Sequence, residues 1–513
     1  MAGADLLRIH NGQTVARSAC PVVAQERFAD VVTAAVAAGC RLSALVATPG
    51  PAGRNVLMAA LADPDAGDIG LVSCHVGESY PALTGRCPAA HWFEREIAEQ
   101  SGIVPQGHPW LKPIRFQACG SGQTRPADST VHAGQGQPPA QTIGVTDFFQ
   151  MSGQEVHEVA VGPVHAGVIE PGHFRFQCHG ETVHHLEISL GYQHRGVERA
   201  LVGGPNRRSI HYAETLAGDT TIGHATAYSM VAESLGGTSA PARGWTIRAV
   251  AAELERLANH IGDLGALAGD VGFLPTMSYC GRIRGDALNM TSLLCGNRFG
   301  RGLVIPGGVA HDLDEETVHA LLVRLDALER DATGAIELLF DAPSVLARFE
   351  GTGVVSEELA RSIGLVGLAA RASGIACDVR SELPYGIYGF SQLPVCTWTT
   401  GDCFARAYVR WMEIGQSIAF VRDQLHALPG GPLAKPLPVL RADSLAVTLV
   451  EGWRGEICHL ATTGADGRFE WYKVVDPSFH NWFGLACSLR EQQISDFPLC
   501  NKSFNLSYCG HDL

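Results

Sequence analysis

A run of residues rich in Gly, Gln, Pro, Ser and Thr, residues 117–145, divides this chain into two unequal parts. Such a composition is typical of a linker, because it combines turn-forming residues with few large apolar side chains. We therefore expect a first domain over residues 1–116 and a larger second domain over residues 146–513.

The first part has the pattern of a compact α/β unit. Apolar residues recur at helical spacing within residues 24–39. Short apolar runs at residues 42–47, 55–61 and 69–76 predict strands of one sheet. A second helix is predicted from residue 91.

The second part begins and ends with strand patterns around a mainly helical region. Residues 155–161 and 174–179 alternate in polarity, which predicts strands. Helical patterns follow, and the clearest cover residues 246–267, 314 to beyond 328, and 403–428. Residues 444–475 predict a hairpin with a third strand. The fold class is thus α+β: a small N-terminal α/β domain, a linker, and a large mainly helical domain with β-rich N-terminal and C-terminal segments.

Composition excludes several classes of protein. A net charge of −14 argues against nucleic acid as a partner. No run of 18 apolar residues predicts a membrane span, and the first residues lack the apolar region of a secretory signal. We expect the 15 cysteines to be reduced in the cytoplasm and mostly buried. None lies in a CxxC motif, so we expect no metal ion or Fe–S cluster held by this chain.

Several motifs carry a resemblance to a known family. They lie at residues 80–84 (YPALT), 92–96 (WFERE) and 107–111 (GHPWL) in the first part, and at 162–165 (GPVH), 190–198 (LGYQHRGVE), 305–309 (IPGGV) and 451–456 (EGWRGE) in the second. The two parts resemble two adjoining peripheral-arm subunits of respiratory complex I. Their fusion is similar to the large subunits of formate hydrogenlyase and group 4 [NiFe] hydrogenases, and residues 162–174 favour that branch.

The resemblance breaks down at the metal site. Hydrogenases of this kind hold nickel and iron with two cysteine pairs, because thiolates bind such soft metals well. Residues 217–220 (AGDT) stand at the first pair, and Ser507 and Gly510 align with the second, around Cys509. A shift of one residue in this alignment would still leave one cysteine in place of four. Nickel is therefore not expected.

Complex I places a quinone-binding Tyr where this chain has Gly218, so that hydrogen-bond donor is absent. The quinone-site His of the family corresponds to either His165 or His173. A quinone stays one candidate acceptor.

Asp219, Thr220 and His224 form the first candidate catalytic group. By resemblance, their segment faces the Fe–S cluster of a partner subunit. A carboxylate, a hydroxyl and an imidazole can bind a polar head group or relay protons. The alternative is a helix N-terminus with Asp219 or Thr220 as its cap.

Glu170 and His173 form a second candidate, because an acid in this region of hydrogenase-like chains can pass protons. A solvent-exposed loop acid is the alternative. His194 and Arg195 are the candidate cofactor-adjacent residues: the resemblance puts Arg195 near the partner's [4Fe–4S] cluster, where fixed positive charge raises a reduction potential. The alternative is an Arg paired with Glu198 or with backbone.

The C-terminal residues Cys509, His511 and Asp512 make a last cluster. In the family this tail folds into the buried centre beside Asp219. We therefore expect these three side chains near Thr220 and His224, as a satisfied polar core rather than a metal site.

The resemblance implies the large subunit of a membrane-associated oxidoreductase, peripheral to the cytoplasmic face of the inner membrane. Its expected partners are a small Fe–S subunit and membrane ion-channel subunits. Electrons would pass from the partner's cluster to quinone or another acceptor, coupled to ion translocation. The alternatives are an active [NiFe] hydrogenase subunit and a non-redox scaffold of an ion-driven assembly. No dinucleotide fingerprint occurs, so NAD is not expected on this chain.

Overall fold

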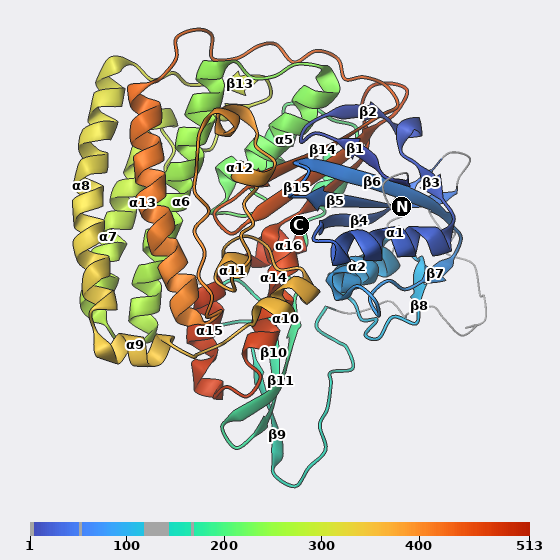
Figure 1. The fold of residues 1–513 in the computed structure, drawn as a ribbon, viewed down its shortest axis with the longest axis horizontal. Coiled ribbons are helices and arrows are strands. Elements are labelled where there is room, and N and C mark those ends of the chain that lie inside the picture. The colour runs from blue at the N-terminus through green and yellow to red at the C-terminus, as the bar shows by residue number, and fades with distance from the viewer. Residues whose placement is uncertain (1–4, 51–53, 117–142, 166–168) are drawn as a thin grey trace.

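The computed structural model describes residues 5–50, 54–116, 143–165 and 169–513. Most of the predicted linker, residues 117–142, lies outside the described residues, so the domain boundary remains a prediction. Helices and strands both contribute substantially, which confirms the α+β class (Figure 1).

The N-terminal part is built on one sheet. Its elements are β1 (Leu7–Ile9), β2 (Thr14–Ala16), β3 (Val22–Val23), α1 (Gln25–Ala37), β4 (Arg41–Pro49), β5 (Asn55–Asp63), β6 (Asp68–Val76), β7 (Ser79–Pro81), α2 (His91–Ser101) and β8 (Val104–Gln106). The sheet runs β1-β6-β5-β4, and β3 pairs with β6 in parallel. The helix and the three strands predicted for this part are confirmed.

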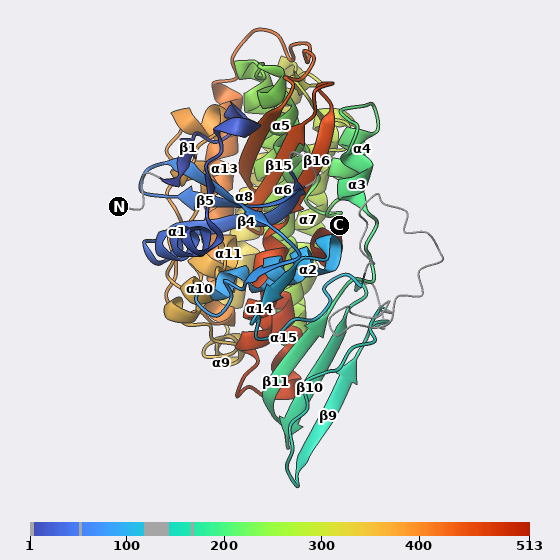
Figure 2. The same cartoon turned by 90° about the vertical axis from the view of Figure 1, so that its right-hand side faces the viewer.

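A three-stranded antiparallel sheet opens the second part. It contains β9 (Val156–Val161), β10 (His173–His179) and β11 (Thr182–Ser189), with β10 in the middle. The sheet projects from the body of the molecule in both ribbon views (Figures 1 and 2). Its two predicted strands, β9 and β10, are confirmed.

A helical layer follows. Its helices are α3 (Val197–Leu201), α4 (Ser209–Glu214), α5 (Thr221–Gly236), α6 (Ala242–Asp270), α7 (Leu274–Cys295), α8 (Glu315–Phe340), α9 (Pro343–Phe349), α10 (Glu357–Ile363), α11 (Gly367–Arg371), α12 (Val379–Glu382) and α13 (Cys403–His426), with the short strands β12 (Val304–Ile305) and β13 (Gly308–Val309). The long helices α6, α7, α8 and α13 lie side by side (Figure 1). The three long helices expected in this region are confirmed as α6, α8 and α13.

The C-terminal region supplies the second large sheet. It contains β14 (Ser444–Glu451), β15 (Glu456–Thr463) and β16 (Phe469–Val475), followed by α14 (Pro477–Ser488), α15 (Phe497–Phe504) and α16 (Tyr508–Asp512). The sheet order is β16-β15-β14-β2, so a strand of the N-terminal part completes it. Helix α5 covers one face of β14 and β15.

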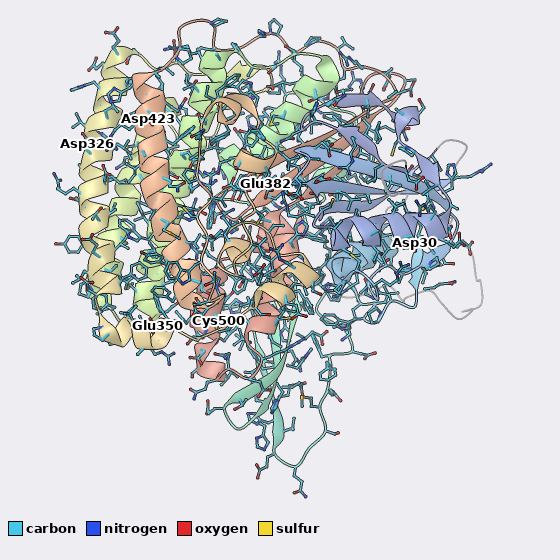
Figure 3. All side chains as sticks on the ribbon, in the orientation of Figure 1. Asp30, Asp326, Glu350, Glu382, Asp423 and Cys500 are labelled. Carbon is cyan, nitrogen blue, oxygen red and sulfur yellow. The ribbon has the colours of Figure 1, made fainter. Side chains whose placement is uncertain are left out.

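The two parts of the chain therefore interlock. Strand β2 pairs antiparallel with β14, with Val15 opposite Leu445. Arg41 of β4 forms ion pairs with Glu382 of α12 at 2.5 Å and with Glu456 of β15 at 2.9 Å. Figure 3 shows Glu382 at this boundary. One buried apolar cluster contains side chains of both parts. The N-terminal part thus packs against the large part and shares a sheet and a buried apolar cluster with it.

A buried carboxylate anchors this interface. Glu96 of α2 accepts hydrogen bonds from Arg115 and from Lys473 of β16. Burial opposes ionisation of Glu96, but the two cations outweigh it and lower its pKa to about 2. Lys473 also pairs with Glu198, at 2.9 Å. Glu96 thus joins the two parts while charged.

The depressed pKa of Glu96 makes the interface sensitive to acid. Because the folded-state value lies below the ordinary value of 4.5, the stabilisation is complete above about pH 4.5 and is lost as pH falls toward 2. Glu96→Gln should lower the free energy of unfolding by about 3 kcal/mol at neutral pH. The difference from wild type should shrink near pH 3, in urea titrations at both pH values.

The matched control is Glu337→Gln, at an exposed position on α8. It should change the stability by no more than about 0.5 kcal/mol at either pH. A constant difference between Glu96→Gln and wild type across this range would contradict the assignment.

Candidate functional site

The segment 217–220 is held by the turn between β14 and β15. Arg454 donates to both carboxylate oxygens of Asp219, at 2.6 and 2.8 Å, and to Oγ1 of Thr220 at 3.2 Å. Its Nε donates to the backbone carbonyl of Asn505, ahead of α16. Trp453 Nε1 donates to the carbonyl of Asp219 at 2.9 Å. One guanidinium therefore ties this segment to the C-terminal tail.

Neither Asp219 nor Thr220 caps α5 with its side chain. Thr220 is the N-cap residue but makes no side-chain cap bond. Glu255 of α6 does so instead, accepting from the backbone N–H of Ile222 at 2.7 Å and of Gly223 at 3.3 Å. Burial raises the pKa of Glu255 to about 8 against the effect of these bonds. Thr220 is therefore the N-cap residue, as the capping alternative expected, but Glu255 supplies the capping bonds, and Asp219 binds Arg454.

His224 lies one helical turn further on and has different partners. Its Nε2 is 2.9 Å from Oδ2 of Asp476, and its Nδ1 is 3.1 Å from Nε2 of His459. His459 Nδ1 in turn lies 2.8 Å from the hydroxyl of Tyr472. The imidazole of His224 is completely buried. The structure thus places His224 in a polar chain inside the protein, while Asp219 remains partly exposed.

The two candidate histidines of the 162–173 segment face backbone carbonyls. His165 Nε2 lies 3.1 Å from the carbonyl of Gly172. His173 Nδ1 lies 3.2 Å from the carbonyl of Gly162, and its Nε2 accepts from Arg175 at 3.2 Å. Burial lowers the pKa of His173. Both ring nitrogens of His173 are therefore engaged. Residues 166–168 of this motif lie outside the described residues.

Glu170 turns toward the C-terminal tail. It accepts from the backbone N–H of Tyr508 at 3.3 Å and contacts the thiol of Cys509. Burial, with the nearby Glu170 carboxylate, raises the pKa of Cys509 to about 11, so this thiol stays protonated. Glu170 and His173, which were expected to act together, have separate partners.

The guanidinium of Arg195 bonds backbone carbonyls. It donates to the carbonyls of Thr215 at 2.6 Å, Leu216 at 2.9 Å and Cys509 at 3.3 Å. His194 Nδ1 lies 2.7 Å from the carbonyl of Asp512. Both residues therefore fix the segment before Asp219 against the C-terminal tail, and the Arg195 charge stays at the surface.

The C-terminal tail enters the centre of the molecule, as expected, but its side chains diverge (Figure 1). His511 stacks on Phe479 with ring centroids 5.4 Å apart and meets Trp92 edge-on at 5.5 Å. The carboxylate of Asp512 accepts from the backbone N–H of Gly191 at 2.8 Å and of Gln193 at 2.9 Å. Cys509 reaches the 217–220 segment, through the backbone of Gly218. The contacts of His511 and Asp512 thus lie with other residues, and their expected place near Thr220 and His224 stays a prediction.

Gly510 of the tail lies in close contact with Asp476. A Cβ atom added to Gly510 would lie 2.7 to 2.9 Å from the carboxyl atoms of Asp476. Asp476 cannot move aside freely, because it binds His224 and accepts from Ser478 N at 2.8 Å. In the described part of the chain, no three His, Cys, Asp or Glu side chains converge to hold a metal ion.

Comparison of the sequence with known proteins shows the family to which the chain belongs. Residues 23–123 match the family of the respiratory-chain NADH dehydrogenase 30 Kd subunit, and residues 270–444 match that of the 49 Kd subunit. Formate hydrogenlyase subunit 5 of Escherichia coli is 30% identical over 84% of this chain and 77% of the relative. The chain belongs to the family of fused complex-I-like and hydrogenase large subunits.

Two further relatives of this family represent its two branches. The carbon monoxide-induced hydrogenase of Rhodospirillum rubrum is 32% identical over 68% of the chain and 97% of the relative. An NADH-quinone oxidoreductase subunit of Bacteroides thetaiotaomicron is 28% identical over 73% of the chain and 74% of the relative. The family is thus one of oxidoreductase subunits. Among the described residues, no helix has the length and apolarity to cross a bilayer.

Sequence reasoning missed four residues that build the site: Glu255, His459, Tyr472 and Asp476. For Asp476 a signal existed, because Asp followed by Pro477 is a typical helix start, and α14 begins there with Asp476 as its cap. His459 and Tyr472 lie in strands and carry no local signal. Arg454 belongs to a family motif, but the motif alone indicated no role for it.

The Arg454 clamp predicts a specific effect of Arg454→Lys. One ammonium group cannot bind both oxygens of Asp219 and the carbonyl of Asn505 at once. We expect the free energy of unfolding to fall by about 2 kcal/mol in urea titrations.

Arg468→Lys is the matched control, because Arg468 donates to the carbonyl of Gly203 at an exposed position. It should change stability by about 0.5 kcal/mol or less. Equal effects of the two substitutions would refute the role of Arg454 as a clamp.

Proposed function

We propose that this chain is the large subunit of a membrane-associated oxidoreductase of the complex-I-like or hydrogenase-4-like kind, and that it works without nickel. It would dock on a small subunit with a [4Fe–4S] cluster and on membrane ion-channel subunits, at the cytoplasmic face of the inner membrane. The cluster would supply electrons, which pass to quinone or another acceptor, coupled to ion translocation. The names of the relatives support the class of assembly.

The contact between Gly510 and Asp476 carries the nickel-free proposal. By the resemblance, Gly510 stands where a hydrogenase has a ligand cysteine, and the Asp476 carboxylate fills the space that a cysteine side chain would need there. Ala217 and Thr220, at the other pair, are buried and contain no sulfur. Cys509 is the one thiol of the tail, and burial keeps it protonated. These residues do not fit a nickel–iron centre.

The remaining residues fit a cluster-fed reaction better. Arg195 holds the segment before Asp219 and places a permanent positive charge at the surface. Such a charge favours reduction of a cluster docked beside it. A Cβ added to Gly218 would have no atom within 4 Å, so this position is open to a ligand or partner.

Of the two histidines considered for a quinone, His165 fits better. Both ring nitrogens of His173 are engaged, whereas no described residue bonds Nδ1 of His165. When its ring is protonated, His165 can therefore donate from Nδ1 to an acceptor carbonyl.

Metal analysis of the purified complex tests the proposal. We expect iron equivalent to about one [4Fe–4S] cluster, no nickel, and no hydrogen uptake in the same sample. Stoichiometric nickel with hydrogen uptake would overturn the nickel-free proposal. A complex with neither metal would instead favour the non-redox scaffold.

The contact at Gly510 makes a separate prediction for Gly510→Ala. Helix propensity alone predicts a gain of stability inside α16. Because the new Cβ meets the Asp476 carboxylate, we expect a loss of about 2 kcal/mol in urea unfolding. The loss should become smaller in an Asp476→Ser background, which keeps a helix-capping oxygen.

Gly218→Ala is the control, because its Cβ would meet nothing within 4 Å. If Gly510→Ala were as well tolerated as Gly218→Ala, Asp476 would not be what excludes a side chain at position 510.

A further inference from the structure

Four buried side chains form one continuous hydrogen-bonded chain behind the site. The hydroxyl of Tyr472 lies 2.8 Å from His459 Nδ1, and His459 Nε2 lies 3.1 Å from His224 Nδ1. His224 Nε2 then lies 2.9 Å from Oδ2 of Asp476. All four side chains are at least 98% buried. They come from β16, β15, α5 and the residue before α14, so the fold assembles the chain from four elements.

The chemistry of the four groups fixes how protons are arranged along the chain. Burial raises the pKa of Tyr472 well above its ordinary value and lowers that of His459 well below, so both are neutral. Burial opposes ionisation of Asp476, but the hydrogen bond from His224 outweighs it and lowers the pKa. Asp476 is therefore an anionic acceptor at one end, and a neutral hydroxyl is the donor at the other.

Strand β16, which carries the donor end of the chain, borders a cavity between the two parts of the protein. This cavity has a volume of about 290 Å³, and Tyr472 contributes to its wall. Polar and charged side chains share the lining, namely His194, Glu96, Glu198, Lys473 and Arg199. His194 Nε2 is buried and has no protein partner among the described residues. A polar cavity of this size can hold several water molecules.

The acceptor end lies at the candidate site. The carboxylate of Asp476 touches Gly510 of the tail. Arg454 contributes to lowering its pKa, and the same guanidinium binds Asp219. The chain therefore begins on the strand that borders the cavity and ends beside the 217–220 segment.

We propose that Tyr472, His459, His224 and Asp476 relay protons between the interdomain cavity and the Asp219 segment. In one step the Tyr472 proton moves to His459 Nδ1, the His459 Nε2 proton to His224 Nδ1, and the His224 Nε2 proton to Asp476. A proton from cavity water replaces the one lost by Tyr472. One proton enters, one arrives at Asp476, and no electron moves. The relay rests on the proposed function, because a reduction at the Asp219 segment would consume these protons.

Tyr472→Phe breaks the relay at its entrance with little change in packing. Its matched control is Tyr228→Phe: Tyr228 is equally buried, lies 6.2 Å from the Tyr472 ring, and bonds Ser209 outside the relay. Loss of one buried hydroxyl should destabilise the two variants to a similar extent. Stability alone therefore does not distinguish the two variants, and measurements that report on proton positions and proton transfer are needed.

The first readout is the proton position on each histidine ring, from long-range ¹H–¹⁵N spectra of the full chain labelled with ¹⁵N-histidine. The rings are assigned with His459→Gln and His224→Gln. In a coupled relay, Tyr472→Phe changes the ring-nitrogen signals of His459 and also of His224, which does not contact Tyr472. Tyr228→Phe leaves both unchanged. A change confined to His459, or none, would overturn the relay.

The second readout is turnover of the whole complex with a soluble quinone, in H₂O and in D₂O. Tyr472→Phe should lower the rate about tenfold or more and enlarge the solvent isotope effect, while Tyr228→Phe matches wild type. Equal rates and isotope effects in all three proteins would overturn the relay. If the wild-type complex itself does not turn over, the proposed function fails with this acceptor, and the histidine spectra still decide whether the relay exists.

Discussion

The bidentate pairing of Arg454 with Asp219 is the interaction on which the centre of this structure depends. It joins the turn after β14, the segment before α5 and the approach to the C-terminal helix through a single planar group. A guanidinium suits this position because its donors are rigid and diverge. Without it, three segments that are distant in the sequence would share no common polar partner. The C-terminal tail would also lose the hydrogen bond that holds Asn505 at the centre of the molecule.

Arg454 can act in this way because buried arginines of the helical region hold its own turn in place. Glu451 binds Arg371 at 2.7 Å, while Arg256 donates to the carbonyls of Glu451 and Gly452. Arg371 and Arg256 also share Glu413 of α13. Buried charges of this kind are costly unless all are paired, so the geometry admits little variation. The helical bundle thereby fixes the position of the sheet turn, and the turn fixes the site.

Local sequence patterns predicted much of the fold but few of the hydrogen bonds and side-chain contacts that build the site. The apolar stripe of α6 and the strand patterns over residues 444–475 are periodic, and this periodicity alone predicts a helix and strands that each bury one face. The cap supplied by Glu255, the Asp476 carboxylate against Gly510, and the three-residue strand β2 depend on contacts across long separations. The tail was predicted to reach the centre, but the contacts of His511 and Asp512 could not be predicted, because the aromatic pocket of α2 and α14 is formed only in three dimensions.

The pairing of β2 with β14 also constrains how the protein comes to be folded. Residues 14–16 leave the ribosome early, whereas their partners in β14 appear only after most of the chain has been made. Closing so long a loop is slow, and a strand edge that waits without its partner can pair with another chain. The fusion of the two parts in one polypeptide shortens that wait, because it holds the early strand at a high local concentration near its late partner. Covalent continuity here serves assembly, by turning the meeting of two subunits into an intramolecular folding step.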